Sequence, residues 1–140
     1  MWLIFLLALA GPRVTTFECQ IGNGRGLLSQ SLEEESDDEL ACHATVSDLG
    51  GRGAADLVVE LRVLPPRGPF RTVASTALQP AGLRGRTPEL YVSHSTWASA
   101  IDWRKPRRPR LRLVLCVLDR PAPSSKTWRL VARAALSLKP

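Results

Sequence analysis

A run of basic side chains between residues 104 and 112 has the composition of an anion-binding site. The stretch reads RKPRRPRLR and ends in a series of aliphatic residues. Positive charge at this density attracts polyanions such as sulfated glycosaminoglycans or nucleic acids, and the attraction depends strongly on salt. The candidate polyanion-binding residues are Arg104, Lys105, Arg107, Arg108 and Arg110.

The same run could instead be a processing site or a structural feature. The tetrapeptides RKPR and RRPR have the Arg-x-x-Arg spacing that furin-like proteases recognise, but Pro106 and Pro109 lie beside the bonds that would be cut. Alternatively, the two prolines keep the segment extended and the arginines stay hydrated. Arg112 would then point outward from a strand in which Leu111 and Leu113 point inward. In that case the run is the solvated start of a core strand.

The cysteines are candidates for a disulfide. Cys19, Cys42 and Cys116 allow two of the three to pair in an oxidising compartment, and the third could join another chain. Cys116 lies within LRLVLCVL, which is equally consistent with a small buried apolar side chain. Because there is no CxxC spacing and His43 and His94 are the only histidines, the sequence predicts no metal site.

No catalytic motif is present in the sequence. It has no G-x-S-x-G elbow and no P-loop, and GNGRG at residues 22–26 lacks the spacing of a dinucleotide-binding loop. We expect His43 on the solvent face of a strand and His94 in a turn, each without an orienting partner at an informative spacing. The sequence therefore predicts neither enzymatic activity nor a cofactor.

The first ten residues, MWLIFLLALA, are uncharged and almost wholly apolar. They are too few to cross a bilayer, which takes about 20 residues. The ALA at positions 8–10 has the small-x-small pattern of a signal-peptidase site. We therefore expect a signal peptide over residues 1–10 and a secreted, extracellular protein without a membrane span in the mature chain. A hydrophobic start that folds into the core is the alternative.

The two halves of the chain differ in charge. Residues 33–39 hold six of the 13 acidic residues, whereas residues 41–140 hold 17 basic and six acidic residues, a net charge of +11. Residues 11–39, with this acidic run, are expected to form a flexible segment, because a block of like charge among Gly and Ser buries little surface. The acidic run could also act as an intramolecular mask over the basic surface.

From residue 40 onward the apolar residues recur with a period of two, which is typical of half-buried strands. LACHATV, LVVELRV, LRLVLCVL and WRLVARAALSLK show the pattern, and Pro- and Gly-rich turns separate them. We predict a mainly β fold, an antiparallel β-sandwich over residues 40–140. A short helix is expected near residues 96–102, with Trp97 and Trp103 as core anchors.

Residues 57–140 resemble the prodomain of the transforming growth factor beta superfamily. The segment RLVLCVLDRPAPSSKTWRLVARAALSLKP is similar in rhythm to prodomain strands of the growth/differentiation factor, inhibin alpha and anti-Müllerian hormone group. The cysteine-dense growth factor that follows such a prodomain does not appear in this sequence. LACHATVSDLGGRGAADLVVELRVLPP is also similar to the last strands of an immunoglobulin-like domain, but Leu40 stands where the tyrosine is expected.

These observations give two expectations of function. The prodomain resemblance implies a secreted, non-enzymatic binding or regulatory module whose partner is an extracellular protein ligand or receptor. The basic run predicts a polyanion-binding protein instead, and the secreted compartment favours a heparin-type glycosaminoglycan over nucleic acid. The two differ in salt dependence, because an apolar interface tolerates salt and a charge-driven one does not.

Overall fold

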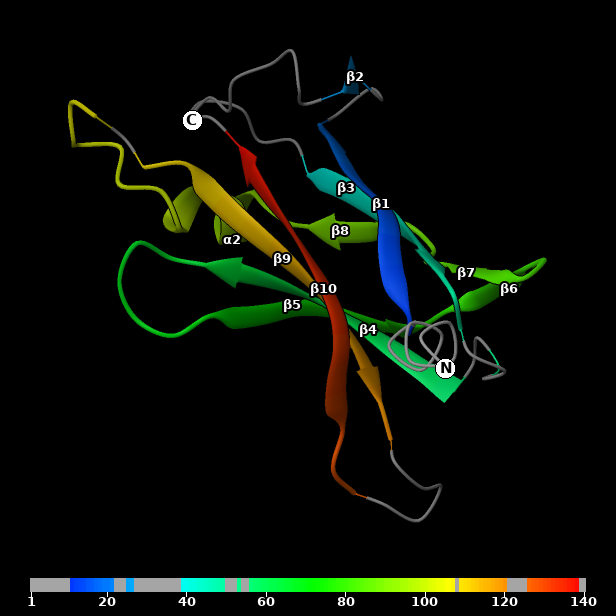
Figure 1. Cartoon of the computed structure of the whole chain (residues 1–140). Helices are drawn as coiled ribbons and strands as arrows, with labels where there is room; N and C mark the ends of the chain where they lie inside the picture. The colour runs from blue at the N-terminus through cyan, green and yellow to red at the C-terminus, as the bar shows by residue number, and fades with distance from the viewer. Residues whose placement is uncertain are drawn as a thin grey trace, which may run out of the picture.

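The structure is a computed structural model, and among the residues it describes it has two antiparallel sheets and one short helix (Figure 1). The described residues are 11–21, 25–26, 39–49, 53, 56–107, 109–120 and 126–138. The predicted mainly β antiparallel sandwich with a short helix is confirmed. The expected signal peptide, most of the acidic run and Arg108 lie outside the described residues.

A four-stranded sheet, here sheet B, supplies much of the hydrophobic core. Its strands lie in the order β10 (Arg129–Leu138), β9 (Leu111–Asp119), β4 (Leu57–Leu64) and β5 (Arg71–Ala77). Every second side chain of β4 and β9 is almost completely buried, as the period-two pattern predicted. These side chains are Leu57, Val59, Leu61, Val63, Leu111, Leu113, Leu115 and Val117.

The second sheet, sheet A, packs across sheet B around the central strand β3. Its strands are β2 (Arg25–Gly26), β1 (Arg13–Ile21), β3 (Leu40–Ser47), β7 (Arg84–Arg86), β6 (Gln79–Ala81) and β8 (Leu90–Val92). Alternate residues of β3 are fully buried, namely Leu40, Cys42, Ala44 and Val46. Strand β3 pairs with β1 on one side and with both β7 and β8 on the other.

Thr87 joins β7 to β8 along the edge of β3. Its backbone N–H donates to the carbonyl oxygen of Ala44 at 3.0 Å, and its side-chain oxygen accepts the Ala44 N–H at 2.9 Å. The side chain therefore satisfies a backbone donor that would otherwise lose its partner between the two short strands. Gly85 allows this edge to approach the core, because a Cβ there would lie 2.8 Å from Leu78 Cδ1.

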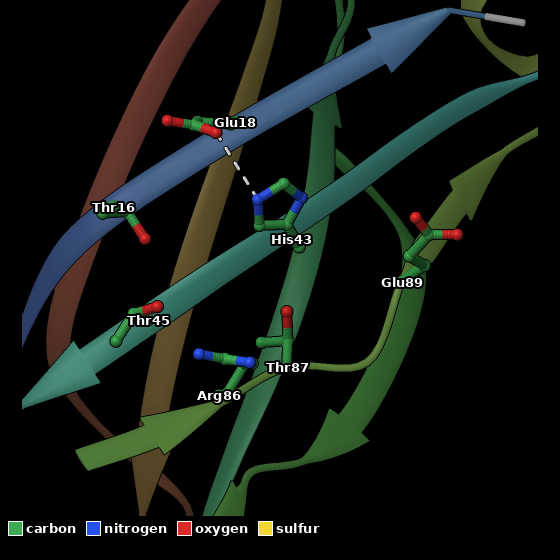
Figure 2. A pocket seen from close by; sticks show the side chains of 7 residues that line it. All are labelled: Thr16, Glu18, His43, Thr45, Arg86, Thr87 and Glu89. Carbon is green, nitrogen blue, oxygen red and sulfur yellow. Dashed lines mark ion pairs between the residues drawn. The ribbon is translucent and has the colours of Figure 1, made fainter. Parts of the chain in front are cut away.

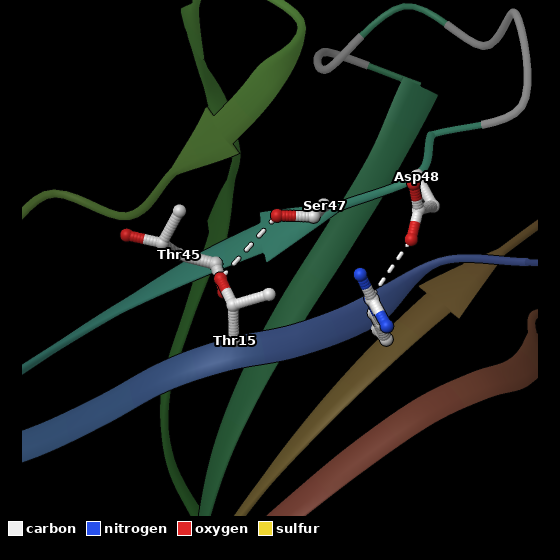
Figure 3. Close-up of polar contacts among 5 residues, drawn as sticks. Thr15, Thr45, Ser47 and Asp48 are labelled. Atoms are coloured by element: carbon white, nitrogen blue, oxygen red, sulfur yellow. Dashed lines mark hydrogen bonds and ion pairs between the residues drawn. The ribbon is translucent and has the colours of Figure 1, made fainter.

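Strand β1 corrects the expectation that residues 11–39 are flexible. The β-sandwich begins at Arg13 rather than at residue 40, and β1 pairs with β3 over its whole length. A bulge at Thr15 interrupts the period of two, which is why the alternation did not mark this strand. Figure 3 shows the bulge held by hydrogen bonds: Thr15 Oγ1 donates to the Thr45 carbonyl at 3.2 Å and lies 3.3 Å from Ser47 Oγ.

The helix α2 (His94–Ser99) closes part of the core between β8 and β9. It starts two residues earlier and ends three residues earlier than the predicted 96–102, with Ser93 as its N-cap. His94 is therefore the first helical residue rather than a turn residue. Trp97 is fully buried, as predicted, and Trp103 is half-buried against the same core.

Strand β10 keeps its predicted alternation only after Leu130. A bulge between Leu130 and Ala132 shifts the register, and Leu130 and Trp128 remain 49% and 37% exposed instead of facing the core. Beyond the bulge, Leu136 is half-buried against the core and Ser137 is exposed, as the sequence predicted.

Substitutions at Leu136 and Ser137 test this alternation. Leu136→Asp should lower the free energy of unfolding by about 2–3 kcal/mol, because it places a charge against the core. Ser137→Asp should change it by about 0.5 kcal/mol or less, because its side chain is exposed. Urea denaturation of both variants measures the difference. Similar losses at the two positions would show that β10 does not present alternate faces.

Candidate functional site

The predicted basic residues lie on the segment that connects α2 to β9. Among the described members, Arg104, Lys105, Arg107 and Arg110 are all exposed. Arg112 is exposed on β9 while its neighbours Leu111 and Leu113 are buried, which confirms the predicted orientation of this strand. The run is thus both the solvated start of a core strand and a dense cluster of positive charge.

The fold adds two arginines to this cluster from a distant part of the sequence. Strands β4 and β9 are antiparallel, with Leu64 opposite Arg112, so the loop after β4 and the segment before β9 leave sheet B at the same end. Figure 1 shows the two loops projecting on the same side of the molecule. The exposed basic residues of this region, called here the basic end surface, are Arg67, Arg71, Arg104, Lys105, Arg107, Arg110 and Arg112.

A short turn anchors the basic segment to the core. The indole N–H of Trp103 donates to the carbonyl oxygen of Ala98 at 3.0 Å, and the Trp103 ring lies 6.5 Å from that of the buried Trp97. Asp102 Oδ1 accepts the backbone N–H of Arg104 at 3.2 Å. The charged side chains therefore extend from a position that the core fixes, which limits the ordering entropy that binding would cost.

The charge of the basic end surface is not neutralised by the described part of the protein. Ion pairs there join Arg13 to Asp48, His43 to Glu18, Arg62 to Glu60 and Arg129 to Asp119. None of these pairs includes a residue of the basic end surface. Exposed guanidinium groups of this kind form bidentate hydrogen bonds with sulfate, phosphate and carboxylate groups.

Two of the three candidate cysteines form a disulfide. Cys19 and Cys42 are opposite each other on β1 and β3 and are bonded. The bond lies within one sheet, whereas immunoglobulin domains carry theirs between two sheets. Cys116 is a free thiol, 2% exposed, and burial raises its pKa. Its sequence environment had left open whether it was buried or disulfide-bonded.

A second polar feature is an open pocket of about 380 Å³ on the outer face of sheet A (Figure 2). It is lined by residues of β1, β3 and the chain from β7 to β8, namely Thr16, Glu18, His43, Thr45, Arg86, Thr87 and Glu89. Glu18 Oε2 lies 3.5 Å from His43 Nε2. These side chains can form hydrogen bonds and ion pairs with a small polar ligand.

Of the residues that line this pocket, only His43 had a position expected from the sequence, the exposed face of its strand, and it lies there. Its partner Glu18 lies on β1, which was expected to be flexible. Beside the pocket, the Tyr91 hydroxyl donates to Glu89 Oε2 at 2.7 Å, and this hydrogen bond raises the pKa of Tyr91. The pairing of β1 with β3 could not be read from the spacing of these residues.

Comparisons with protein-family models, with curated proteins and with solved structures found no match to this chain. Within the described residues, no helix is long and apolar enough to span a membrane. The same residues contain no group of three or more His, Cys, Asp or Glu side chains placed to hold a metal ion.

Proposed function

We propose that this protein is an extracellular, non-enzymatic binding module whose basic end surface binds sulfated glycosaminoglycan chains. The observation that carries the proposal is the convergence of two loops, which with the adjoining starts of β5 and β9 expose seven basic side chains outside the ion pairs of the described residues. Binding would release the counterions that surround the polyanion, so its affinity should fall steeply as salt rises.

The extracellular location is part of the proposal. The disulfide between Cys19 and Cys42 is typical of proteins that fold in an oxidising compartment. The apolar first ten residues supply the expected signal peptide. In that compartment the abundant polyanions are sulfated polysaccharides, which is why we favour them over nucleic acids. The prodomain resemblance, and a growth factor or carrier as partner, stays a prediction from sequence.

Heparin affinity chromatography tests the proposal. Replacing Arg104, Lys105, Arg107 and Arg110 together by Ser should lower markedly the salt concentration at which the protein elutes. Its thermal stability should change little, because exposed charges contribute little to folding. The matched control replaces Arg84, Arg86, Arg120 and Lys126, which lie on other parts of the surface and remove the same charge. If both variants elute at the same salt concentration, only net charge matters and the proposal fails.

A double variant tests whether the arginines that only the fold adds to the basic end surface take part in binding, beside the basic run of residues 104–112. Arg67→Ser with Arg71→Ser should also weaken heparin binding, because both residues belong to the basic end surface. Its control, Arg84→Ser with Lys126→Ser, removes two charges elsewhere. Equal elution of these two double variants would restrict the binding site to residues 104–112.

A further inference from the structure

Strand β9 is apolar on both of its faces. Leu111, Leu113, Leu115 and Val117 face the core, but the residues between Leu113 and Asp119 that point the other way are also apolar: Val114, Cys116 and Leu118. A strand with one face in water normally alternates apolar and polar residues, whereas a strand covered on both faces is apolar throughout. The pattern indicates that the outward side of β9 is built to be covered.

The chain itself covers the part of the outer face of sheet B around Cys116 and Leu118, and Leu118 is 8% exposed. Cys116 lies opposite Glu60 on β4 and Arg133 on β10 and is 2% exposed. Arg62 donates to Glu60 at 2.8 Å, and its guanidinium carbon lies 4.3 Å from the centroid of the Phe70 ring. The stems of these long side chains shield the centre from water while their charged groups remain near the surface.

Large apolar side chains remain exposed toward both ends of the face. At one end, Leu130 is 49% exposed beside Leu118, and Trp128 is 37% exposed. At the other end, Phe70 is 51% exposed and contacts Arg62. The two ends are separated along the strands by most of the length of β9, from Arg112 to Leu118, which is roughly 20 Å at the rise of a strand. Across the sheet they are also separated by the three strand spacings from β5 to β10, roughly 14 Å.

The charges on this face define the partner that would fit. Arg112 and Arg133 are exposed and take part in none of the ion pairs among the described residues. Among the residues of the four strands of sheet B, the outward carboxylate is Glu60, and it is already paired with Arg62. A second copy of the same face would bring arginines against arginines. Complementarity therefore requires apolar side chains flanked by carboxylates.

The kind of backbone follows from the geometry of the face. An extended peptide laid on the face of a sheet would leave its backbone N–H and C=O groups without partners, because strands pair at sheet edges. A helix satisfies its own backbone and packs on a sheet face through one apolar stripe. Because Phe70 precedes β5 and Leu130 lies on β10, the diagonal between them is roughly 25 Å, which takes a helix of about 16 residues or more at 1.5 Å per residue.

We propose that the outer face of sheet B is a docking surface for an acidic amphipathic helix of a partner protein. Its apolar stripe contacts Phe70 at one end and Leu130 with Trp128 at the other, and its carboxylates pair with Arg112 and Arg133. This surface lies on a face of the sandwich, whereas the proposed glycosaminoglycan site lies at an end. The two share Arg112 and are otherwise composed of different residues.

A direct binding measurement with a synthetic helix tests the docking surface. The probe is a fluorescently labelled 18-residue peptide with Leu at helical i, i+3 and i+4 spacing and Glu at most other positions. One comparison peptide has the same composition with the Leu positions scrambled, and another has Lys in place of Glu. Fluorescence anisotropy should show binding of the first peptide at least tenfold tighter than of either comparison peptide. No binding of the first peptide, or equal binding of the scrambled one, overturns the proposal.

Variants of the protein locate the binding. Phe70→Ser with Leu130→Ser should weaken peptide binding at least tenfold. The matched control is Leu83→Ser with Tyr91→Ser, because these large side chains are 94% and 53% exposed, in the turn between β6 and β7 and on β8. The control should bind like the unmodified protein, and circular dichroism should confirm that both variants fold. Equal weakening in the two double variants would show that the peptide does not dock on this face.

Two further measurements distinguish helix docking on the outer face of sheet B from peptide binding at the basic end surface and from dimer formation. The variant lacking Arg104, Lys105, Arg107 and Arg110 should bind the peptide within about threefold of the unmodified protein. If it loses peptide binding, the peptide acts as a polyanion at the basic end surface and no separate docking site exists. If the unmodified protein forms dimers that Phe70→Ser with Leu130→Ser dissociates, the occupant is a second copy and the proposal is overturned.

Discussion

Replacing Trp97 by alanine should lower the free energy of unfolding by about 3–5 kcal/mol, the range typical of a large aromatic residue removed from a core. The side chain is fully buried in α2. Its ring makes edge contacts with His94 at 4.9 Å and Trp103 at 6.5 Å between centroids. The substitution removes this buried area and leaves a cavity between β8 and β9 that the surrounding strands can fill only in part.

Denaturation in urea, followed by circular dichroism, measures this loss. Tyr91→Ala is a suitable control, because that ring is 53% exposed on β8 and its loss should cost about 1 kcal/mol or less. A loss below about 1 kcal/mol for Trp97→Ala would show that the indole is not an essential part of the core.

The strands that could be predicted from sequence are those whose alternation is uninterrupted. In β3 and β4 each inward position holds an apolar residue and most outward positions hold less apolar ones, so a period of two is enough to orient them. In β9 the exposed Arg112 between Leu111 and Leu113 gives the orientation, because the residues that follow are apolar on both faces. Strand β1 was missed because the bulge at Thr15 changes the spacing of its half-buried residues Val14 and Phe17 from two to three. The predicted inward position of Leu130 was wrong for the same reason, because a bulge follows it in β10.

The composition of the candidate site depends on contacts that are distant in sequence. The density of charge at residues 104–112 is local and can be read directly from the sequence. The contribution of Arg67 and Arg71 follows only from the pairing of Leu64 with Arg112, 48 residues apart in the chain. The ion pair between Glu18 and His43 likewise needs the register of β1 against β3. No period or motif in the sequence specifies the register of β1 against β3, because packing of the whole sheet determines it.

The disulfide is a further case in which register decided among alternatives. Three cysteines allow three pairings, and the sequence left the choice among them open. Once β1 and β3 are neighbours, Cys19 and Cys42 stand directly opposite each other, while Cys116 lies on sheet B with its side chain on the outer face. The buried thiol therefore has no cysteine within reach.

Removing the disulfide by Cys19→Ala with Cys42→Ala should lower the free energy of unfolding by about 3 kcal/mol. The two cysteines are 23 residues apart, and opening a loop of this length restores conformational freedom mainly to the unfolded chain. Chemical denaturation without reductant measures the loss. Mild reduction of the unmodified protein should produce a similar loss, since it opens the same loop without changing any side chain. A double variant as stable as the unmodified protein would contradict this account.

Thiol alkylation followed by mass spectrometry checks the pairing itself. In the folded protein no thiol should react, because Cys116 is 2% exposed and burial, which raises its pKa, keeps it protonated near neutral pH. Unfolding without reductant should expose one reactive thiol, Cys116, and unfolding with reductant should expose all three cysteines. A mass twice that of the chain without reductant would mean that Cys116 joins two copies. It would also mean that the outer face of sheet B opens far more readily than its packing implies.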